Sequence, residues 1–106
     1  MEKRQDPLRL WQICEKTWNL KTMLYRSSRF RRQWKRLSTK IRDEAIVRLL
    51  MLVRSEYDPL LNNHALSGKY AEYRSINVTG DVRIAYGRVP GGFHLFAIGT
   101  HSELYK

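Results

Sequence analysis

With 106 residues, the chain is long enough for one modest hydrophobic core and too short for two, so we expect a single domain. Hydrophobic residues make up 42% and charged residues 28%, a balance typical of globular proteins that excludes a disordered chain. Twenty Lys and Arg against ten Asp and Glu give a formal net charge of +10. This excess predicts a polyanionic partner such as nucleic acid, the ribosome, an acidic protein or an anionic membrane surface.

A single cysteine, Cys14, excludes an intramolecular disulfide and a multi-thiolate metal site, which fits a reducing compartment. The first twenty residues carry charges throughout and lack the apolar segment of a secretory signal. The longest apolar stretch, residues 46–53, is interrupted by Arg48 and is far shorter than a membrane span. We therefore expect a cytoplasmic protein with no membrane partner.

Residues 1–22 differ in pattern from the rest of the chain. Trp11, Ile13, Cys14 and Trp18 stand among scattered charges and form only a weak amphipathic helical pattern. Two interpretations stay open: an extension upstream of a natural start at residue 23, or an extra helix that docks on the domain. The compact domain itself is expected to span residues 23–106.

Two helices are expected near the start of this domain. Ser27 or Ser28 is a suitable N-cap for the first, because a hydroxyl there can accept a hydrogen bond from a free backbone amide. Phe30, Trp34 and Leu37 then follow at i, i+4 and i+7, which places them on one helical face.

The second helix is expected after Ser38, with Asp43 and Glu44 in its first turn, where carboxylates suit the helix dipole. Its predicted buried stripe consists of Ile41, Ala45, Ile46, Leu49, Leu50 and Val53. The Asp58-Pro59 pair is expected to end this helix or to follow closely on its end.

After residue 59 the pattern changes from helical to alternating, which is typical of strands. Three strands are predicted there, over residues 69–78, 82–89 and 93–98, and a further short strand over residues 22–26 precedes the helices. The predicted fold is α+β: a small antiparallel sheet of about four strands, in the order β-α-α-β-β-β, with the two N-terminal helices packed on one face.

The first helix and its flanks are strongly basic. Eight basic residues and no acidic ones lie between residues 26 and 42: Arg26, Arg29, Arg31, Arg32, Lys35, Arg36, Lys40 and Arg42. A charge run can be a solvated helix face, but the absence of counter-charges favours phosphate binding, with affinity that falls as salt rises. We expect phosphate contacts with RNA from five of these residues: Arg29, Arg31, Arg32, Lys35 and Arg36. Such contacts provide affinity without sequence specificity.

RNA can be cleaved without a metal or cofactor when a base acts on the 2′-OH, an acid on the leaving 5′-oxygen and a positive charge on the phosphate. Histidine can fill either proton-transfer role near neutral pH. Of the three histidines, His94 lies inside a predicted strand and is assigned a structural role. His64 and His101 lie at loop or strand ends beside Gly68 and Gly99, where function concentrates. Neither has an acidic partner at helical spacing, so no metal site and no cofactor is expected.

Four sequence features follow one another at fixed spacing: HALSG at residues 64–68, Tyr73-Arg74, the turn at Asp81, and GTHSELY at residues 99–105. In this order they resemble the RelE/ParE toxin superfamily of type II toxin–antitoxin systems, and within it the YafQ-like ribosome-dependent mRNA interferases. The resemblance covers residues 23–106. It implies a small antiparallel sheet backed by two N-terminal helices and an endoribonuclease that cuts mRNA in the ribosomal A site.

The resemblance also implies roles for individual residues. His101 is expected to be the principal proton-transfer residue and the general acid, and His64 a second proton-transfer or phosphate-orienting residue. Asp81 is expected to contribute to acid–base chemistry or to positioning. Tyr105 takes the place of a C-terminal aromatic residue that orients the substrate.

Two positions depart from the YafQ pattern. Asn77 stands where a further histidine is expected and cannot transfer a proton, and Val82 stands where a tryptophan would offer a stacking surface. Arg83 or Arg74 can compensate by stabilising the phosphate. Lys69 and Asn77 complete the expected substrate-binding residues.

The resemblance implies three partners: mRNA, the ribosome, and a cognate antitoxin that is acidic, partly disordered and folds on binding. Two alternatives stay open. A ParE-like toxin would poison DNA gyrase and would not require His64, Asp81 and His101. A catalytically degenerate module would bind RNA or the ribosome without cleaving.

Overall fold

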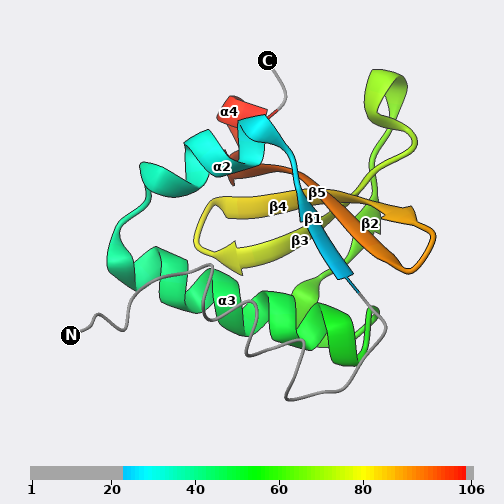
Figure 1. The fold of residues 1–106 in the computed structure, drawn as a ribbon, viewed down its shortest axis with the longest axis horizontal. Helices are drawn as coiled ribbons and strands as arrows, with labels where there is room; N and C mark the ends of the chain where they lie inside the picture. The colour runs from blue at the N-terminus through cyan, green and yellow to red at the C-terminus, as the bar shows by residue number, and fades with distance from the viewer. Residues whose placement is uncertain (1–22, 105–106) are drawn as a thin grey trace.

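The computed structural model describes residues 23–104, so the expectations for residues 1–22 and for Tyr105 lie outside the described residues. The elements in chain order are β1 (Met23–Arg26), α2 (Ser28–Lys35), α3 (Thr39–Arg54), the 3-10 turn η1 (Pro59–Leu61), β2 (His64–Ala65), the 3-10 turn η2 (Gly68–Tyr70), β3 (Arg74–Thr79), β4 (Val82–Val89), β5 (Gly92–Thr100) and α4 (His101–Leu104). In Figure 1, α3 lies along one face of the sheet, whereas α4 and the loop that carries η2 rise on the opposite side.

The five strands form one sheet in the order β1-β5-β4-β3-β2, which confirms the α+β class. Strands β3, β4 and β5 pair antiparallel as expected, and the short β2 pairs antiparallel with β3, but β1 pairs parallel with β5, so the sheet is mixed. Short hairpins force antiparallel pairing only on consecutive strands. Two helices separate β1 from the other strands, so its direction was not set by a turn. The sheet also has one strand more than the four expected, because residues 64–65 pair with β3.

The N-caps of α2 and α3 are serines. Ser27 Oγ accepts a hydrogen bond from the Phe30 amide at 2.9 Å, which confirms the predicted start of α2. Ser38 Oγ accepts from the Ile41 amide at 3.3 Å and begins α3 directly. Asp43 and Glu44 therefore lie beyond the first turn of α3, contrary to expectation, because the cap comes earlier than the acidic pair suggested.

The helix α3 ends at Arg54, four residues before Asp58, and its buried stripe is narrower than predicted. Ala45, Leu49 and Leu52 are its buried residues, spaced by four and three positions along one line. The predicted Ile41, Ile46, Leu50 and Val53 are only partly buried. They flank this line, because a single helix resting on a sheet buries fewer residues than an apolar helix surrounded on all sides.

The helix α2 occupies the edge of β5 that β1 leaves uncovered. β1 pairs with β5 only as far as Leu95. Beyond that point, Ser27 Oγ donates to the Phe96 carbonyl at 2.6 Å, and Gln33 Oε1 accepts from the Ile98 amide at 2.9 Å. Side chains of α2 and of its N-cap thus satisfy backbone groups that a longer β1 would have paired.

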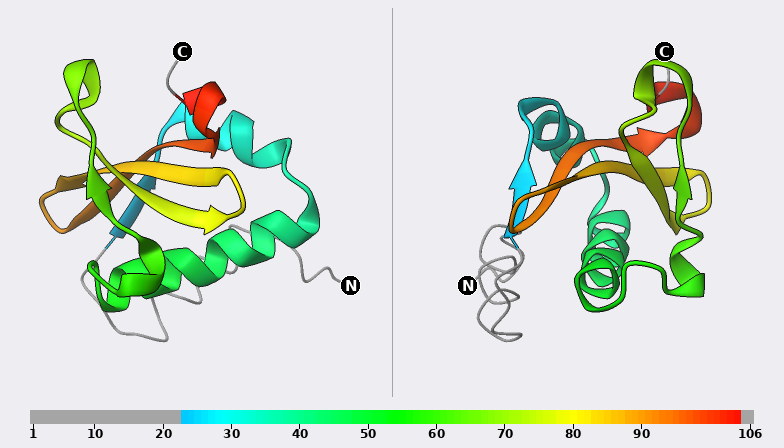
Figure 2. Two further views of the ribbon diagram at one scale, coloured as in Figure 1. Left: turned by 180° about the vertical axis from the view of Figure 1, so that it is seen from behind. Right: turned by 90° about the vertical axis from the view of Figure 1, so that its right-hand side faces the viewer.

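The main core is formed by residues of the helices and of the sheet face that carries Ile76, Val78 and Ile84. Figure 2 shows α3 running along one face of the sheet. The helices contribute Phe30, Trp34, Ala45, Leu49 and Leu52 to it. The predicted strand over residues 69–78 begins only at Arg74, because residues 68–70 form the turn η2. No helix within residues 23–104 combines the length and the apolar character needed to cross a membrane.

Candidate active site

The motif at residues 99–105 folds into a strand end followed by a capped helical turn. The Thr100 amide donates to Glu103 Oε1 at 2.8 Å, and the Glu103 amide donates to Thr100 Oγ1 at 3.3 Å. This reciprocal pair is a capping box, which satisfies backbone amides at the start of a helix. His101 is the first residue of α4 and is exposed, so the box fixes the backbone that carries the expected general acid.

The other end of α4 is held by Arg29 of α2. One guanidinium nitrogen of Arg29 donates to the carbonyls of Leu104 at 3.1 Å and Glu103 at 3.3 Å. The Leu104 side chain is buried. Arg29, predicted to contact RNA, therefore serves a contact within the protein, whereas Arg31, Arg32, Lys35 and Arg36 are exposed.

Asp81 and His101 lie at the same end of the sheet. Val82, the first residue of β4, is the Cα partner of Thr100, the last residue of β5. Asp81 precedes Val82 and His101 follows Thr100, so the strand pairing brings these two expected catalytic residues to neighbouring positions. Both are exposed.

His64 lies on the edge strand β2, on the face of the sheet turned away from the main core. Its Cα partner is Ser75, which is opposite Ala85, which in turn is opposite Ala97. Residues directly opposite each other share a face, so this row leads from His64 to β5 across three strand spacings, roughly 14 Å. His64 is therefore three strands away from β5, the strand that His101 follows.

Asn77 and Arg83 form the neighbouring row on the same face, opposite Gly99. Arg83 donates to Asn77 Oδ1 at 3.0 Å. Arg83 Nε and Ser75 Oγ are both buried and have no hydrogen-bond partner within residues 23–104. Unsatisfied buried donors are costly, and here two of them stand between the expected catalytic residues.

Aromatic rings cover the other part of this face. The Tyr73 ring stacks on Phe96 with centroids 4.7 Å apart, and Tyr70 packs 6.1 Å from Phe96. Tyr73 reaches Phe96 across β4 because Gly87 has no side chain: a Cβ there would lie 3.2 Å from the Tyr73 ring. Lys69 extends this row, with its ammonium 5.3 Å from the Tyr70 ring centroid.

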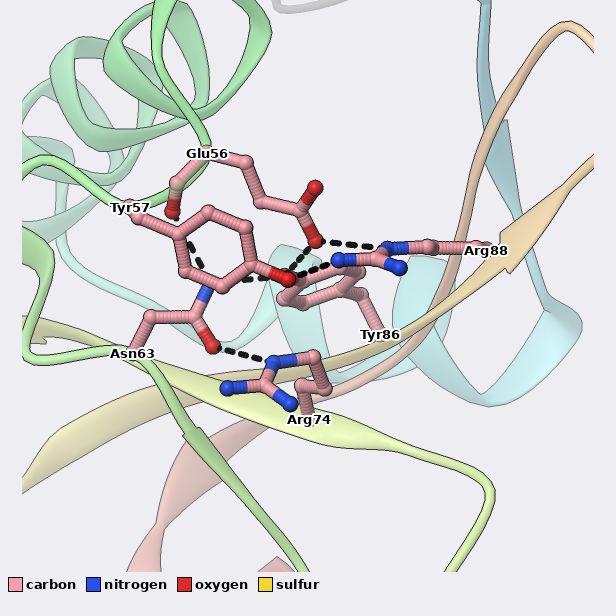
Figure 3. A network of polar contacts seen from close by, with 6 residues as sticks. All are labelled: Glu56, Tyr57, Asn63, Arg74, Tyr86 and Arg88. Atoms are coloured by element: carbon pink, nitrogen blue, oxygen red, sulfur yellow. Dashed lines mark hydrogen bonds and ion pairs between the residues drawn. The ribbon is translucent and has the colours of Figure 1, made fainter.

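The expected substrate-binding residue Arg74 belongs to a polar network at the end of the sheet (Figure 3). Its Nε donates to Asn63 Oδ1 at 2.7 Å, and its guanidinium lies 5.4 Å from the Tyr57 ring centroid. Glu56 Oε2 in turn accepts from the Tyr86 hydroxyl at 2.6 Å and from Arg88 Nε at 2.9 Å. Sequence reasoning missed this network, because its members come from segments up to 32 residues apart and carry no motif.

This network shifts the pKa values of Glu56 and Tyr86. Burial acts to raise the pKa of Glu56, but hydrogen bonds from Arg88 and Tyr86 and the charges of Arg88 and Arg74 outweigh it, so this pKa falls below its ordinary value of 4.5. Burial and the hydrogen bond to Glu56 raise the pKa of Tyr86 far above its ordinary value of 10. At neutral pH Glu56 is thus an ionised acceptor and Tyr86 a protonated donor.

The remaining histidine, His94, lies within β5, opposite Gly87 and beside Tyr25 of β1, and is partly buried. Within residues 23–104, no three His, Cys, Asp or Glu side chains gather closely enough to hold a metal ion.

Residues 22–106 match the family model described as the bacterial toxin of type II toxin–antitoxin systems, YafQ. The chain belongs to the YafQ toxin family. Among curated protein sequences, none matches this chain.

Solved structures of toxins share the fold of this YafQ-family chain. YafQ from Escherichia coli strain BL21(DE3) is similar with a TM-score of 0.69 and 16% identity, covering 80% of this chain and 99% of that one. A copper-bound mutant toxin from Helicobacter pylori gives a TM-score of 0.61 and 25% identity, with 77% and 97% covered. The Escherichia coli DinJ–YafQ toxin–antitoxin complex is similar with a TM-score of 0.64 and 19% identity, and the match covers 82% of this chain and 100% of that one.

Proposed function

We propose that this YafQ-family toxin is a ribosome-dependent mRNA endonuclease that needs no metal. In the proposed reaction the 2′-oxygen loses its proton and attacks the adjacent phosphorus, and the bond from phosphorus to the 5′-oxygen breaks as that oxygen takes up a proton. The products are a 2′,3′-cyclic phosphate and a 5′-hydroxyl. The observation that carries the proposal is family membership together with the pairing that brings Asp81 and His101 to one end of the sheet.

His101 is proposed as the general acid that protonates the leaving 5′-oxygen. Its exposure leaves the imidazole accessible to RNA. The capping box and the hydrogen bond from Arg29 to the Leu104 carbonyl hold the backbone of α4, which His101 begins. Fixed geometry supports proton transfer, because the acid must lie within hydrogen-bond reach of the leaving atom. Asp81, one position beyond β4 at the same sheet end, would orient His101 or share its acid–base role.

His64 is proposed as the second proton-transfer residue. Its Nδ1 lies 3.0 Å from the Asn62 carbonyl oxygen, a contact that requires the proton on Nδ1 because a carbonyl only accepts. The neutral imidazole then presents an unprotonated Nε2, the form that a general base needs. The distance between β2 and β5 means that the substrate would have to span the sheet face between the two histidines.

Arg83 is proposed as the phosphate-stabilising residue. Its guanidinium lies on the same sheet face, and Asn77 orients it through the 3.0 Å hydrogen bond. A fixed cation beside the reacting phosphate stabilises the charge that develops there. Asn77 thus contributes by holding Arg83 rather than by proton transfer. Lys69, Arg74 and Tyr105 keep the substrate-binding roles that the resemblance implies.

The partners proposed are the ribosome, mRNA and an acidic, partly disordered antitoxin. The exposed basic residues of α2 and of its C-cap suit ribosomal RNA: Arg31, Arg32, Lys35 and Arg36. The structure of the DinJ–YafQ toxin–antitoxin complex supports an antitoxin partner for this chain.

The testing experiment is induced expression in a bacterium, with mRNA 5′ ends mapped for the wild type and for His101→Ala. Removing a general acid costs about 10²–10⁴-fold in rate, so cuts in translated messages and growth arrest should disappear in the variant. His94→Ala is the matched control, since it removes a histidine outside the site. Growth arrest of equal strength in the wild type and His101→Ala, without cuts in mRNA, would instead indicate gyrase poisoning. The absence of arrest in every strain would indicate a degenerate binding module.

A further inference from the structure

Asn63 is fixed by three hydrogen bonds, which use both protons of its side-chain amide and one lone pair of the amide oxygen. Its Nδ2 donates to the Tyr86 hydroxyl at 2.7 Å and to the Glu56 carbonyl at 2.9 Å, while its Oδ1 accepts from Arg74 Nε at 2.7 Å. Figure 3 shows these partners converging on Asn63 from three different segments.

The partners permit only one orientation of this amide. A backbone carbonyl only accepts and an arginine Nε only donates, so a flipped amide would oppose acceptor to acceptor and donor to donor. The Tyr86 hydroxyl already donates its proton to Glu56 Oε2 at 2.6 Å and can therefore only accept from Asn63. The chain at Asn63 is thus tied in a defined geometry to β4 and to the segment after α3.

These hydrogen bonds of Asn63 lie directly before His64, the first residue of β2, and β2 is otherwise weakly held. β2 has only two paired residues, His64 opposite Ser75 and Ala65 opposite Arg74, and it is an edge strand. So short an edge pairing opens easily by itself. Arg74 holds both sides of His64, because its backbone pairs with Ala65 and its side chain binds Asn63.

The same tie sets the contact that the His64 ring makes. Asn62, which supplies the carbonyl for His64 Nδ1, has a left-handed backbone with φ of 48°. Asparagine tolerates this conformation, but it is not the preferred state of a free chain. Because Asn63 lies between Asn62 and His64 and its hydrogen bonds fix the chain there, the Asn62 carbonyl stays directed at the imidazole.

We propose that Asn63 is a positioning residue for His64, and that Tyr86 and Glu56 act through it to hold the imidazole with its Nδ1 on the Asn62 carbonyl. The consequence is a His64 ring whose Nε2 is presented to substrate before RNA binds. The inference rests on the proposed function for its effect on cleavage, but the ring geometry itself can be tested without any cleavage.

The first test measures single-turnover cleavage of ribosome-bound mRNA by Asn63→Ala in the wild-type and in the His64→Ala backgrounds. A misplaced catalytic group costs up to about 10²-fold, so Asn63→Ala should lower the rate by about 10- to 100-fold in the wild-type background only. An equal loss in both backgrounds would overturn the proposal, because Asn63 would then act independently of His64.

Tyr86→Phe and Tyr57→Phe form a matched pair of variants. Each removes one phenol hydroxyl from the same network, but only the Tyr86 hydroxyl contacts Asn63. Tyr86→Phe should lower cleavage in the same direction as Asn63→Ala, whereas Tyr57→Phe keeps its ring against Arg74 and should cleave as the wild type does. Equal behaviour of the two would contradict the assignment. Tyr86→Phe also serves as the test if Asn63→Ala does not fold.

The second test records the ¹⁵N NMR signals of the His64 ring in the whole protein. In the wild type the neutral ring should carry its proton on Nδ1, and in Asn63→Ala and Tyr86→Phe the signals should move toward protonation at Nε2. Unchanged signals would overturn the positioning role. If His64→Ala cleaved normally while the signals moved as expected, the catalytic role proposed for His64 would fail and the positioning inference would stand.

Discussion

The carboxylate of Glu103 fills the space that a side chain on Gly99 would need. A Cβ at Gly99 would lie 2.7 Å from Glu103 Oε1, closer than real Cβ atoms approach an oxygen. That same oxygen accepts from the Thr100 amide. The glycine, the threonine and the glutamate of the GTHSE sequence are therefore coupled structurally, and His101 is carried between them.

Gly99→Ala should displace the Glu103 side chain and break its bond to Thr100. The loss should be about 1 kcal/mol of unfolding free energy, the usual cost of losing a helix cap, with reduced cleavage because the His101 backbone loosens. Glu103→Ala should have a similar effect. The double variant should be no less stable than Glu103→Ala alone, as thermal unfolding can measure, and additive losses would show that Gly99 is needed for another reason.

Glu56→Gln should destabilise the protein by about 1–3 kcal/mol at pH 7, because it weakens hydrogen bonds made to a charged group. The pKa of Glu56 is lowered in the folded state, so its contribution to stability is present above pH 4.5 and is lost as pH falls through the folded pKa. The difference between wild type and variant should thus shrink between pH 7 and pH 3 in urea unfolding. Glu72→Gln, which changes an exposed carboxylate, is the control. A difference independent of pH would argue against an ionised Glu56.

Reversing the exposed charges of α2 should weaken ribosome binding. The fourfold variant changes Arg31, Arg32, Lys35 and Arg36 to Glu. The slope of log affinity against log salt is negative, and each lost phosphate contact should reduce its magnitude by about 0.7–0.9, because fewer counterions are released. Co-sedimentation with ribosomes at several salt concentrations measures this slope.

A single pair of variants controls for net charge. Arg36→Glu and Arg54→Glu each reverse one exposed arginine, at the C-cap of α2 and at the end of α3 respectively. Only Arg36→Glu should weaken binding. Equal weakening by both would indicate a response to total charge rather than a binding surface on α2.

Local patterns in the sequence were sufficient to predict much of the fold. The serine cap at Ser27, the helical spacing of Phe30 and Trp34, and the strand over residues 82–89 all depend on interactions within a few residues, and the structure has them as expected. The start of β3 was predicted too early, because the 3-10 turn η2 occupies residues 68–70 and such turns have no clear periodicity. The helix α3 ends at Arg54, shortly before the Asp58-Pro59 pair that was expected to end it or to follow closely on its end.

The sequence by itself determined the α+β class, the positive charge and the toxin family, because composition, periodicity and motif spacing are written along the chain. Only the tertiary structure decided that β1 runs parallel to β5, that Arg29 binds the end of α4, and that Asn63, Tyr86 and Glu56 meet behind His64. These contacts join residues 23 to 75 positions apart in the chain. Which residues meet in these contacts depends on how the whole sheet packs, so a local sequence pattern cannot predict them.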